Sequence, residues 1–114
     1  MSKKLKIYID TSVISFLFDD HSPDLQKITK EFFELHSHKY ELYSSDLLLE
    51  EVNDTKDLVK KQKIKNYFDT LNITILETNQ EVRDLVDLYI QDEIFTDKMR
   101  ADARHVALAT INNI

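Results

Sequence analysis

The fold of this chain is decided by the stretch Leu5-Lys6-Ile7-Tyr8-Ile9-Asp10-Thr11-Ser12. Residues 5–9 are rich in β-branched and aromatic side chains, a composition that predicts a short strand buried on both faces. The strand would end at Asp10, a carboxylate followed by two hydroxyl side chains. In open parallel sheets, functional groups gather beyond the carboxyl ends of the strands. Asp10 is therefore the first candidate for a functional residue.

Two further segments, residues 40–44 and 72–76, predict strands by the same criterion. Apolar residues at helical spacing predict helices over residues 13–18, 23–37, 46–53, 57–71, 78–90 and 97–112. The helix that starts at Pro23 would have an apolar face made of Leu25, Ile28, Phe32 and Leu35. Thr78 and Glu81 form a capping box at the start of another helix. Strands alternating with helices predict an α/β fold with a parallel sheet, and 114 residues suit one domain over positions 1–114.

Composition excludes several classes of protein. The absence of cysteine rules out disulfides and thiolate metal sites and fits the cytoplasm, and the absence of glycine excludes the phosphate-binding loops of Rossmann and P-loop proteins. The first apolar stretch is interrupted at Asp10 and Asp19, so we expect neither a membrane span nor a signal peptide. A net charge of −6 argues against a nucleic-acid binder with a basic face, unless bound metal ions reverse the local field.

Each candidate carboxylate also has a structural interpretation. Asp10 could cap the helix that begins near Val13. Glu50 and Glu51 follow an apolar run, so a helix would turn one towards the core and the other to water, although such acidic pairs usually form a solvated face.

Asp102 lies in Ala101-Asp102-Ala103-Arg104-His105-Val106-Ala107-Leu108-Ala109, a mostly small and apolar segment that predicts a buried helix. A buried carboxylate needs a partner, which would be either Lys98 one turn earlier or a metal ion shared with other carboxylates. His105 would be a ligand, a base or a packed histidine with both nitrogens hydrogen-bonded. The lysines at positions 56, 60, 61, 63 and 65 would form a solvated helix face or meet phosphates.

Three carboxylates brought together repel one another, and a divalent cation would resolve that conflict. Oxygen ligands without cysteine suit Mg²⁺ or Mn²⁺. Such a centre activates water and stabilises a phosphodiester transition state, so the pattern favours hydrolysis of a nucleic-acid strand.

Three segments resemble, in order and spacing, the motifs of the PIN-domain family, and of VapC-type toxins in particular. They are Ile7-Tyr8-Ile9-Asp10-Thr11-Ser12-Val13-Ile14, Ser45-Asp46-Leu47-Leu48-Leu49-Glu50-Glu51-Val52 and Asp102-Ala103-Arg104-His105-Val106-Ala107-Leu108-Ala109. In the second motif of the family a Glu follows a Ser by six positions. Counting from Ser45 selects Glu51, whereas counting from Ser44 would select Glu50.

The resemblance implies a three-layer PIN-like fold and a cytoplasmic Mg²⁺- or Mn²⁺-dependent endoribonuclease, such as the toxin of a type II toxin–antitoxin pair. Asp10, Glu51 and Asp102 would be its catalytic metal ligands, with Thr11 or Ser12 orienting Asp10 and His105 in support. Its partners would be an RNA substrate, a cognate antitoxin and a second copy of the chain, with no membrane. Alternatively, the chain would be a catalytically inactive PIN-like module that binds RNA or a protein.

The chain departs from the family in one respect, which concerns strands 4 and 5 of the family's usual order, 3-2-1-4-5. This sequence ends at Ile114, where a fourth strand with another acidic residue should begin, so we expect the C-terminal strands of the family to be missing. The strand before Asp10 would then lie at an open edge, which invites pairing. Phosphotransfer through Asp10 fits poorly, because haloacid-dehalogenase-like enzymes need a second Asp where this chain has Ser12, and receiver domains need an Asp where it has Glu77.

Overall fold

The computed structural model describes residues 4–114, so positions 1–3 of the predicted domain lie outside the described part. Its strands and helices are β1 Leu5–Tyr8, α1 Thr11–Phe16, α2 Pro23–Glu31, β2 Tyr40–Ser45, α3 Asp46–Asn53, α4 Leu58–Asp69, β3 Ile73–Leu76, α5 Gln80–Gln91 and α6 Arg100–Ile111. Most of these elements lie where the sequence predicts them. No helix in residues 4–114 has the length and apolar character needed to cross a membrane.

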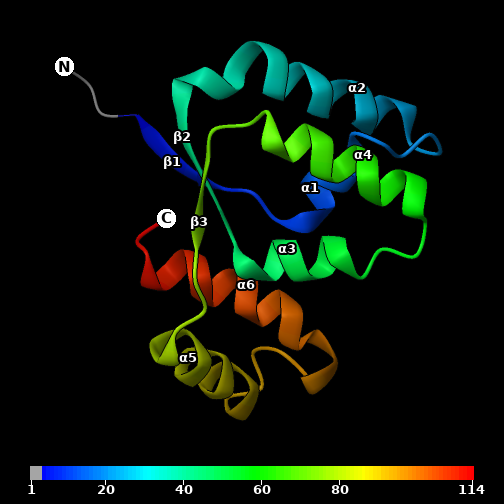
Figure 1. Ribbon diagram of the computed structural model, residues 1–114. Helices are drawn as coiled ribbons and strands as arrows, with labels where there is room; N and C mark the ends of the chain where they lie inside the picture. Colours follow the sequence, from blue (N-terminus) through cyan, green and yellow to red (C-terminus); the bar gives the residue numbers. More distant parts are fainter. Residues whose placement is uncertain (1–3) are drawn as a thin grey trace.

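The strands form one three-stranded parallel sheet in the order β1-β2-β3, which confirms the predicted α/β class. In its register, Tyr8 pairs with Tyr43 and Ser45 pairs with Leu76. β1 lies at an edge of this sheet, and its first half extends beyond the packed helices, so that Leu5 is 72% exposed (Figure 1). The prediction that this strand is buried on both faces is therefore wrong.

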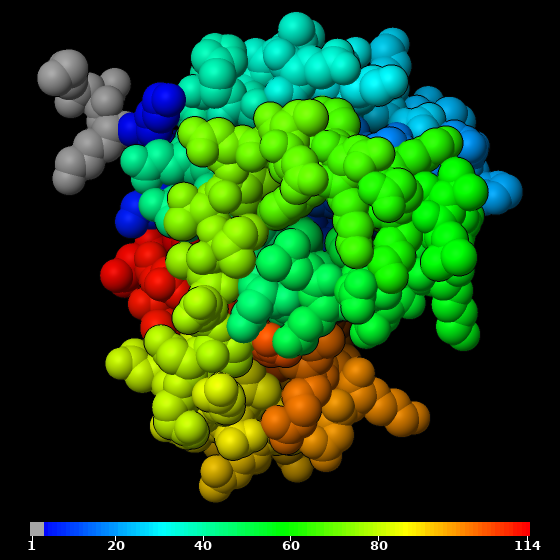
Figure 2. Space-filling model, viewed as in Figure 1, coloured from blue at the N-terminus to red at the C-terminus, as the bar shows by residue number. Residues whose placement is uncertain are grey.

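Two hydrophobic clusters divide the molecule. The first contains Ile9, Ile14, Leu17, Phe33, Leu42, Leu48, Val52 and Ile64, and the second contains Leu47, Val82, Val86, Ala103, Ala107 and Leu108. In Figures 1 and 2, α2 and α4 occupy the upper half of the view, while α5 and α6 occupy the lower half. Helices therefore pack in two separate layers, with the sheet and α3 between them.

The short helix α3 contributes to both clusters. Leu47 packs into the cluster of α5 and α6, whereas the next residue, Leu48, packs into the other cluster. Glu51 lies four residues after Leu47 and three after Leu48, and side chains at these spacings share a helix face. The packing of two leucines thus turns Glu51 towards the boundary between the layers.

The packed face of α2 differs from the predicted one. Leu25, Ile28 and Leu35 are exposed, whereas Thr29 and Phe33 are buried. Burial of the polar Thr29 is tolerated because its hydroxyl donates to the Leu25 carbonyl at 2.6 Å. Beyond Glu31 the helix widens into a π turn, Phe32–His36, so that simple helical spacing does not continue through the predicted stripe.

The start of α5 also differs from the predicted capping box. The N-cap is Asn79, whose side chain accepts from the Val82 amide at 3.0 Å. Thr78 lies one residue too early for this role. Its amide and hydroxyl both donate to Asp46 at the start of α3, at 2.9 and 2.8 Å.

Helix ends reveal how a chain without glycine turns. Asn113 follows α6 at φ 60°, and Glu93 follows α5 at φ 59°. After Glu93 the chain closes the helix end, since the amide of Ile94 donates to the carbonyl of Tyr89 at 2.9 Å. Asparagine tolerates the left-handed region, but for glutamate this conformation costs about 1 kcal/mol.

We therefore expect Glu93→Gly to raise the free energy of unfolding by up to about 1 kcal/mol, because glycine removes the strain at the C-terminal end of α5. The matched control is Glu81→Gly in the right-handed first turn of α5, which should lower it by about 1 kcal/mol. Urea unfolding of both variants measures the difference. A destabilised Glu93→Gly variant would contradict the assignment of strain.

Candidate functional site at the carboxyl edge of the sheet

Asp10 lies directly beyond β1 and begins α1. The ladder with β2 extends to Ile9, whose amide donates to the Tyr43 carbonyl at 2.7 Å and whose carbonyl accepts from the buried Ser44 hydroxyl at 2.7 Å. Asp10 then caps α1, with Oδ1 accepting from the Val13 amide at 3.2 Å and from the Ser12 hydroxyl at 2.7 Å. The capping interpretation is thus confirmed, and Ser12 rather than Thr11 orients this carboxylate.

Glu51 joins α3 to α1 and α6. Its Oε1 accepts from the Thr11 hydroxyl at 2.9 Å and lies 2.6 Å from Nε2 of His105. The His105 side chain is 12% exposed and that of Glu51 is 35% exposed, so the contact lies at the rim of the protein interior. Two residues of the predicted site therefore meet directly.

The other ring nitrogen of His105, Nδ1, begins a series of contacts that runs into the protein interior. Nδ1 lies 2.7 Å from the Tyr8 hydroxyl, which lies 2.7 Å from Oγ of Ser45. Ser45 is fully buried at the end of β2. Both ring nitrogens are thus hydrogen-bonded, as expected for a packed histidine, but one of the partners is a candidate metal ligand.

Electrostatics keep Tyr8 protonated. Burial raises the pKa of the Tyr8 phenol to about 12; the charges of Asp10, Asp46 and Glu51 act in the same direction, and the hydrogen bond with Ser45 opposes them. The phenol is therefore neutral near pH 7 and has one proton to donate.

Glu50, the neighbour of Glu51, belongs to a separate cluster. Its carboxylate is paired with Arg104 of α6 at 2.8 and 3.3 Å. Arg104 also donates to the Thr78 hydroxyl at 2.8 Å and lies 3.3 Å from Asp46. These contacts of Arg104 with Glu50, Thr78 and Asp46, called the Arg104 clamp below, hold α6 against α3 and the start of α5. Glu50 therefore has a structural partner, and Glu51 is the glutamate that lies at the candidate site.

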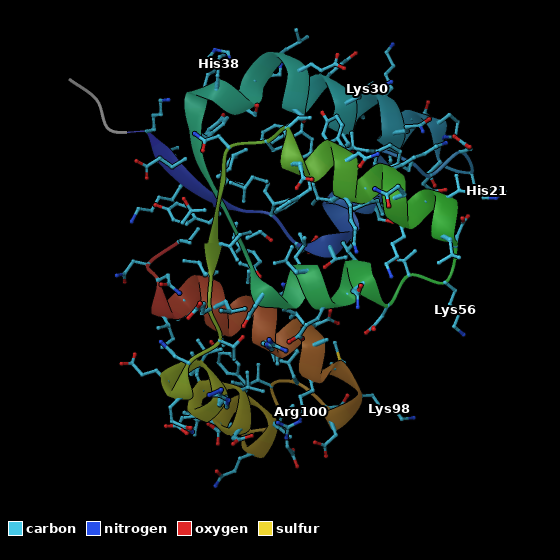
Figure 3. All side chains as sticks on the ribbon, in the orientation of Figure 1. His21, Lys30, His38, Lys56, Lys98 and Arg100 are labelled. Carbon is cyan, nitrogen blue, oxygen red and sulfur yellow. The ribbon has the colours of Figure 1, made fainter. Side chains whose placement is uncertain are left out.

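Asp102 is exposed, so the prediction that it is buried is wrong. Only one face of α6 packs inward, through Ala103, Ala107 and Leu108, and its remaining alanines do not require burial. The predicted ion pair with Lys98 does not form within residues 4–114, and Lys98 projects away from the molecule (Figure 3). Asp102 lies one turn before His105 on the same helix.

The predicted ligands are carboxylate oxygens, which is the type of ligand that a hard divalent cation prefers. Oδ2 of Asp10 and Oε2 of Glu51 form no hydrogen bond within the described part of the chain. Since that part contains no buried side-chain oxygen without a partner, both atoms face solvent. However, no three histidine or carboxylate side chains in residues 4–114 converge as a metal-binding group, so we derive no reaction step through a metal.

Sequence reasoning missed Tyr8, Asp46 and Arg104 as parts of this region. Arg104 carried a usable signal, because a guanidinium in a helix of small residues needs a carboxylate partner as much as Asp102 seemed to. Tyr8 carried a weaker one, a phenol in an otherwise aliphatic strand end. Neither signal names the partner.

Low pH should weaken the Arg104 clamp, because it protonates the Asp46 carboxylate. Burial alone would raise the pKa of Asp46, but the hydrogen bonds from Thr78 and the charge of Arg104 outweigh burial and lower it below 3.8. A carboxyl with a depressed folded-state pKa stabilises the protein above its ordinary pKa, and this contribution is lost as pH falls through the folded-state value. We expect wild type to exceed Asp46→Asn in urea stability at pH 7, with a gap that shrinks below about pH 4. An equal gap at pH 3 and pH 7 would contradict this.

Comparison with known proteins adds no relative. No protein-family model, curated protein or solved structure matches this chain.

Proposed function

We propose that this chain is a PIN-like, metal-dependent endoribonuclease domain. The observation that carries the proposal is the junction at Glu51, where residues from all three motif segments meet. Thr11 comes from the first segment and His105 from the third, and both contact the glutamate of the second. Of the remaining proposed ligands, Asp10 is adjacent to Thr11 in the sequence, and Asp102 lies three residues before His105 on α6.

Mg²⁺ or Mn²⁺ is the proposed cofactor, held by Asp10, Glu51 and Asp102. Such an ion would supply an activated water and would stabilise the negative charge of a phosphodiester undergoing hydrolysis. The chain itself orients the ligands: Ser12 and the α1 amide hold one oxygen of Asp10, and Thr11 and His105 hold one oxygen of Glu51. In each carboxylate the second oxygen is left facing solvent.

A groove near the site supports RNA as the substrate. It encloses about 380 Å³, and its lining includes Lys30, Lys60 and Lys63 with the aromatic rings of Phe18 and Tyr67. None of these lysines forms an ion pair in the described residues. Lysines beside aromatic rings suit a single nucleic-acid strand. The Asp20 and Asp57 carboxylates also line the groove, but each accepts a hydrogen bond from an amide nitrogen.

The position of this groove also suits a substrate strand. It lies beside the end of α1, whereas Asp10 caps the start of that helix. Six helical residues rise about 9 Å, so one strand can reach both places. A larger cavity of about 600 Å³ is less suited, because no aromatic ring of residues 4–114 lines it and two of its three arginines, Arg100 and Arg104, are already paired with carboxylates.

The proposed partners follow from the same assignment. An antitoxin protein would bind the chain in the cytoplasm, as for other toxins of this type. A second copy would pair along β1, since β2 is its only strand neighbour in the described sheet.

A second candidate function is a PIN-like module without catalysis that binds RNA or a protein. The exposed Asp102 and the lack of a converged acidic group in residues 4–114 favour it. Such a module would show neither RNA cleavage nor a rise in thermal stability with Mn²⁺, because only a ligand that binds the folded state raises stability.

The two glutamates of α3 provide a matched test. We expect wild type to cleave single-stranded RNA with Mn²⁺ and to stop when EDTA is added. Glu51→Gln, Asp10→Asn and Asp102→Asn should each lower the rate at least about 100-fold, since even indirect contacts to a metal typically contribute 10- to 100-fold. Glu50→Gln should cleave at close to the wild-type rate, because Glu50 is paired with Arg104. Cleavage that resists EDTA, or equal loss in both glutamate variants, would contradict the assignment.

A further inference from the structure

We propose that Tyr8 is a positioning residue that acts through His105 to fix the Glu51 carboxylate. This inference rests on the proposed metal-binding function of Glu51. It is carried by an unbroken series of contacts, Ser45 to Tyr8 at 2.7 Å, Tyr8 to His105 at 2.7 Å and His105 to Glu51 at 2.6 Å. The series runs from the fully buried end of β2 to the rim of the site.

With Glu51 ionised and His105 neutral, one set of hydrogen-bond directions satisfies every group in the series. An ionised carboxylate only accepts, so Nε2 of His105 carries the proton that it donates to Glu51. In neutral imidazole Nδ1 is then an acceptor, and the Tyr8 hydroxyl donates to it. The phenol has only one proton, so the Ser45 hydroxyl donates to the phenol oxygen. Every proton in the series is used once, and His105 is held as a single tautomer.

The result is a carboxylate with one constrained oxygen. Thr11 and His105 both bond Oε1, which leaves Oε2 for another ligand. Hydrogen bonds that fix the ring of a histidine or the oxygen of a ligand typically set metal affinity in this way. Tyr8 is thus two contacts away from Glu51, and its hydrogen bond with Nδ1 holds the His105 ring in the orientation that places Nε2 at Glu51.

The first measurement is the tautomer of His105, read from its ¹⁵N chemical shifts by NMR in the full chain without metal. Wild type should show the Nε2–H form alone. Tyr8→Phe should show a mixture, because a ring that is no longer held at Nδ1 can turn and present either nitrogen to Glu51. Tyr43→Phe is the matched control: Tyr43 is the register partner of Tyr8, but its hydroxyl bonds Glu41, so this variant should keep the wild-type tautomer. A wild-type Nδ1–H form, or an unchanged tautomer in Tyr8→Phe, would overturn the proposal.

The second measurement is the affinity for Mn²⁺ alone, followed by its electron paramagnetic resonance signal. Tyr8→Phe should bind about 10- to 100-fold more weakly than wild type, and Tyr43→Phe should bind equally well. Equal binding by Tyr8→Phe would overturn the positioning role while leaving the proposed function intact. A wild type that fails to bind Mn²⁺ would instead overturn the proposed function, and the positioning role with it.

A double variant separates positioning from stability. Tyr8→Phe leaves the buried Ser45 hydroxyl without a partner, which lowers the thermal midpoint. Adding Ser45→Ala removes that orphaned hydroxyl, so the double variant should recover most of the lost thermal stability but none of the lost Mn²⁺ affinity. Recovery of both would show that Tyr8 has only a structural role.

Discussion

The Oε1 atom of Glu51 accepts hydrogen bonds from Thr11 and His105, and these bonds join three helices at the carboxyl edge of the sheet. The apolar side chains of α1 pack in one hydrophobic cluster and those of α6 in the other, and apolar packing does not fix the direction of a polar side chain. The position of Glu51 is set in turn by Leu47 and Leu48, which anchor α3 in opposite layers. The candidate site is therefore a consequence of how the two cores meet.

The Arg104 clamp supports this arrangement through other residues of α3. Arg104 bonds Glu50 and Thr78, and Thr78 in turn bonds Asp46. Two consecutive residues of α3 thus pair with two consecutive residues of α6. Glu50 pairs with Arg104 in the clamp, and Glu51 pairs with His105 at the candidate site. The Arg104 clamp holds α6 against α3, so that His105 lies where it can reach Glu51.

Much of the fold could be predicted from local pattern, because each strand is a short apolar run and most helices have an apolar periodicity. The family resemblance selects Glu51 over Glu50 by its spacing to Ser45, and in the structure Glu50 is the one paired with Arg104. The hydrogen-bonding partners were not predictable, since Tyr8 and His105 lie 97 positions apart and no local pattern links them. Burial of Asp102 was predicted wrongly because alanine is compatible with both core and surface, so an alanine-rich helix does not show which face packs.

The central claim is that Asp10, Glu51 and Asp102 share a divalent cation. The most direct test is anomalous diffraction at the manganese edge from crystals of this chain grown with Mn²⁺. The account predicts one anomalous peak about 2.1 Å from oxygens of all three carboxylates, the distance typical of small hard divalent ions. A fully ordered site without such a peak, with Glu51 bonded only to Thr11 and His105, would contradict it.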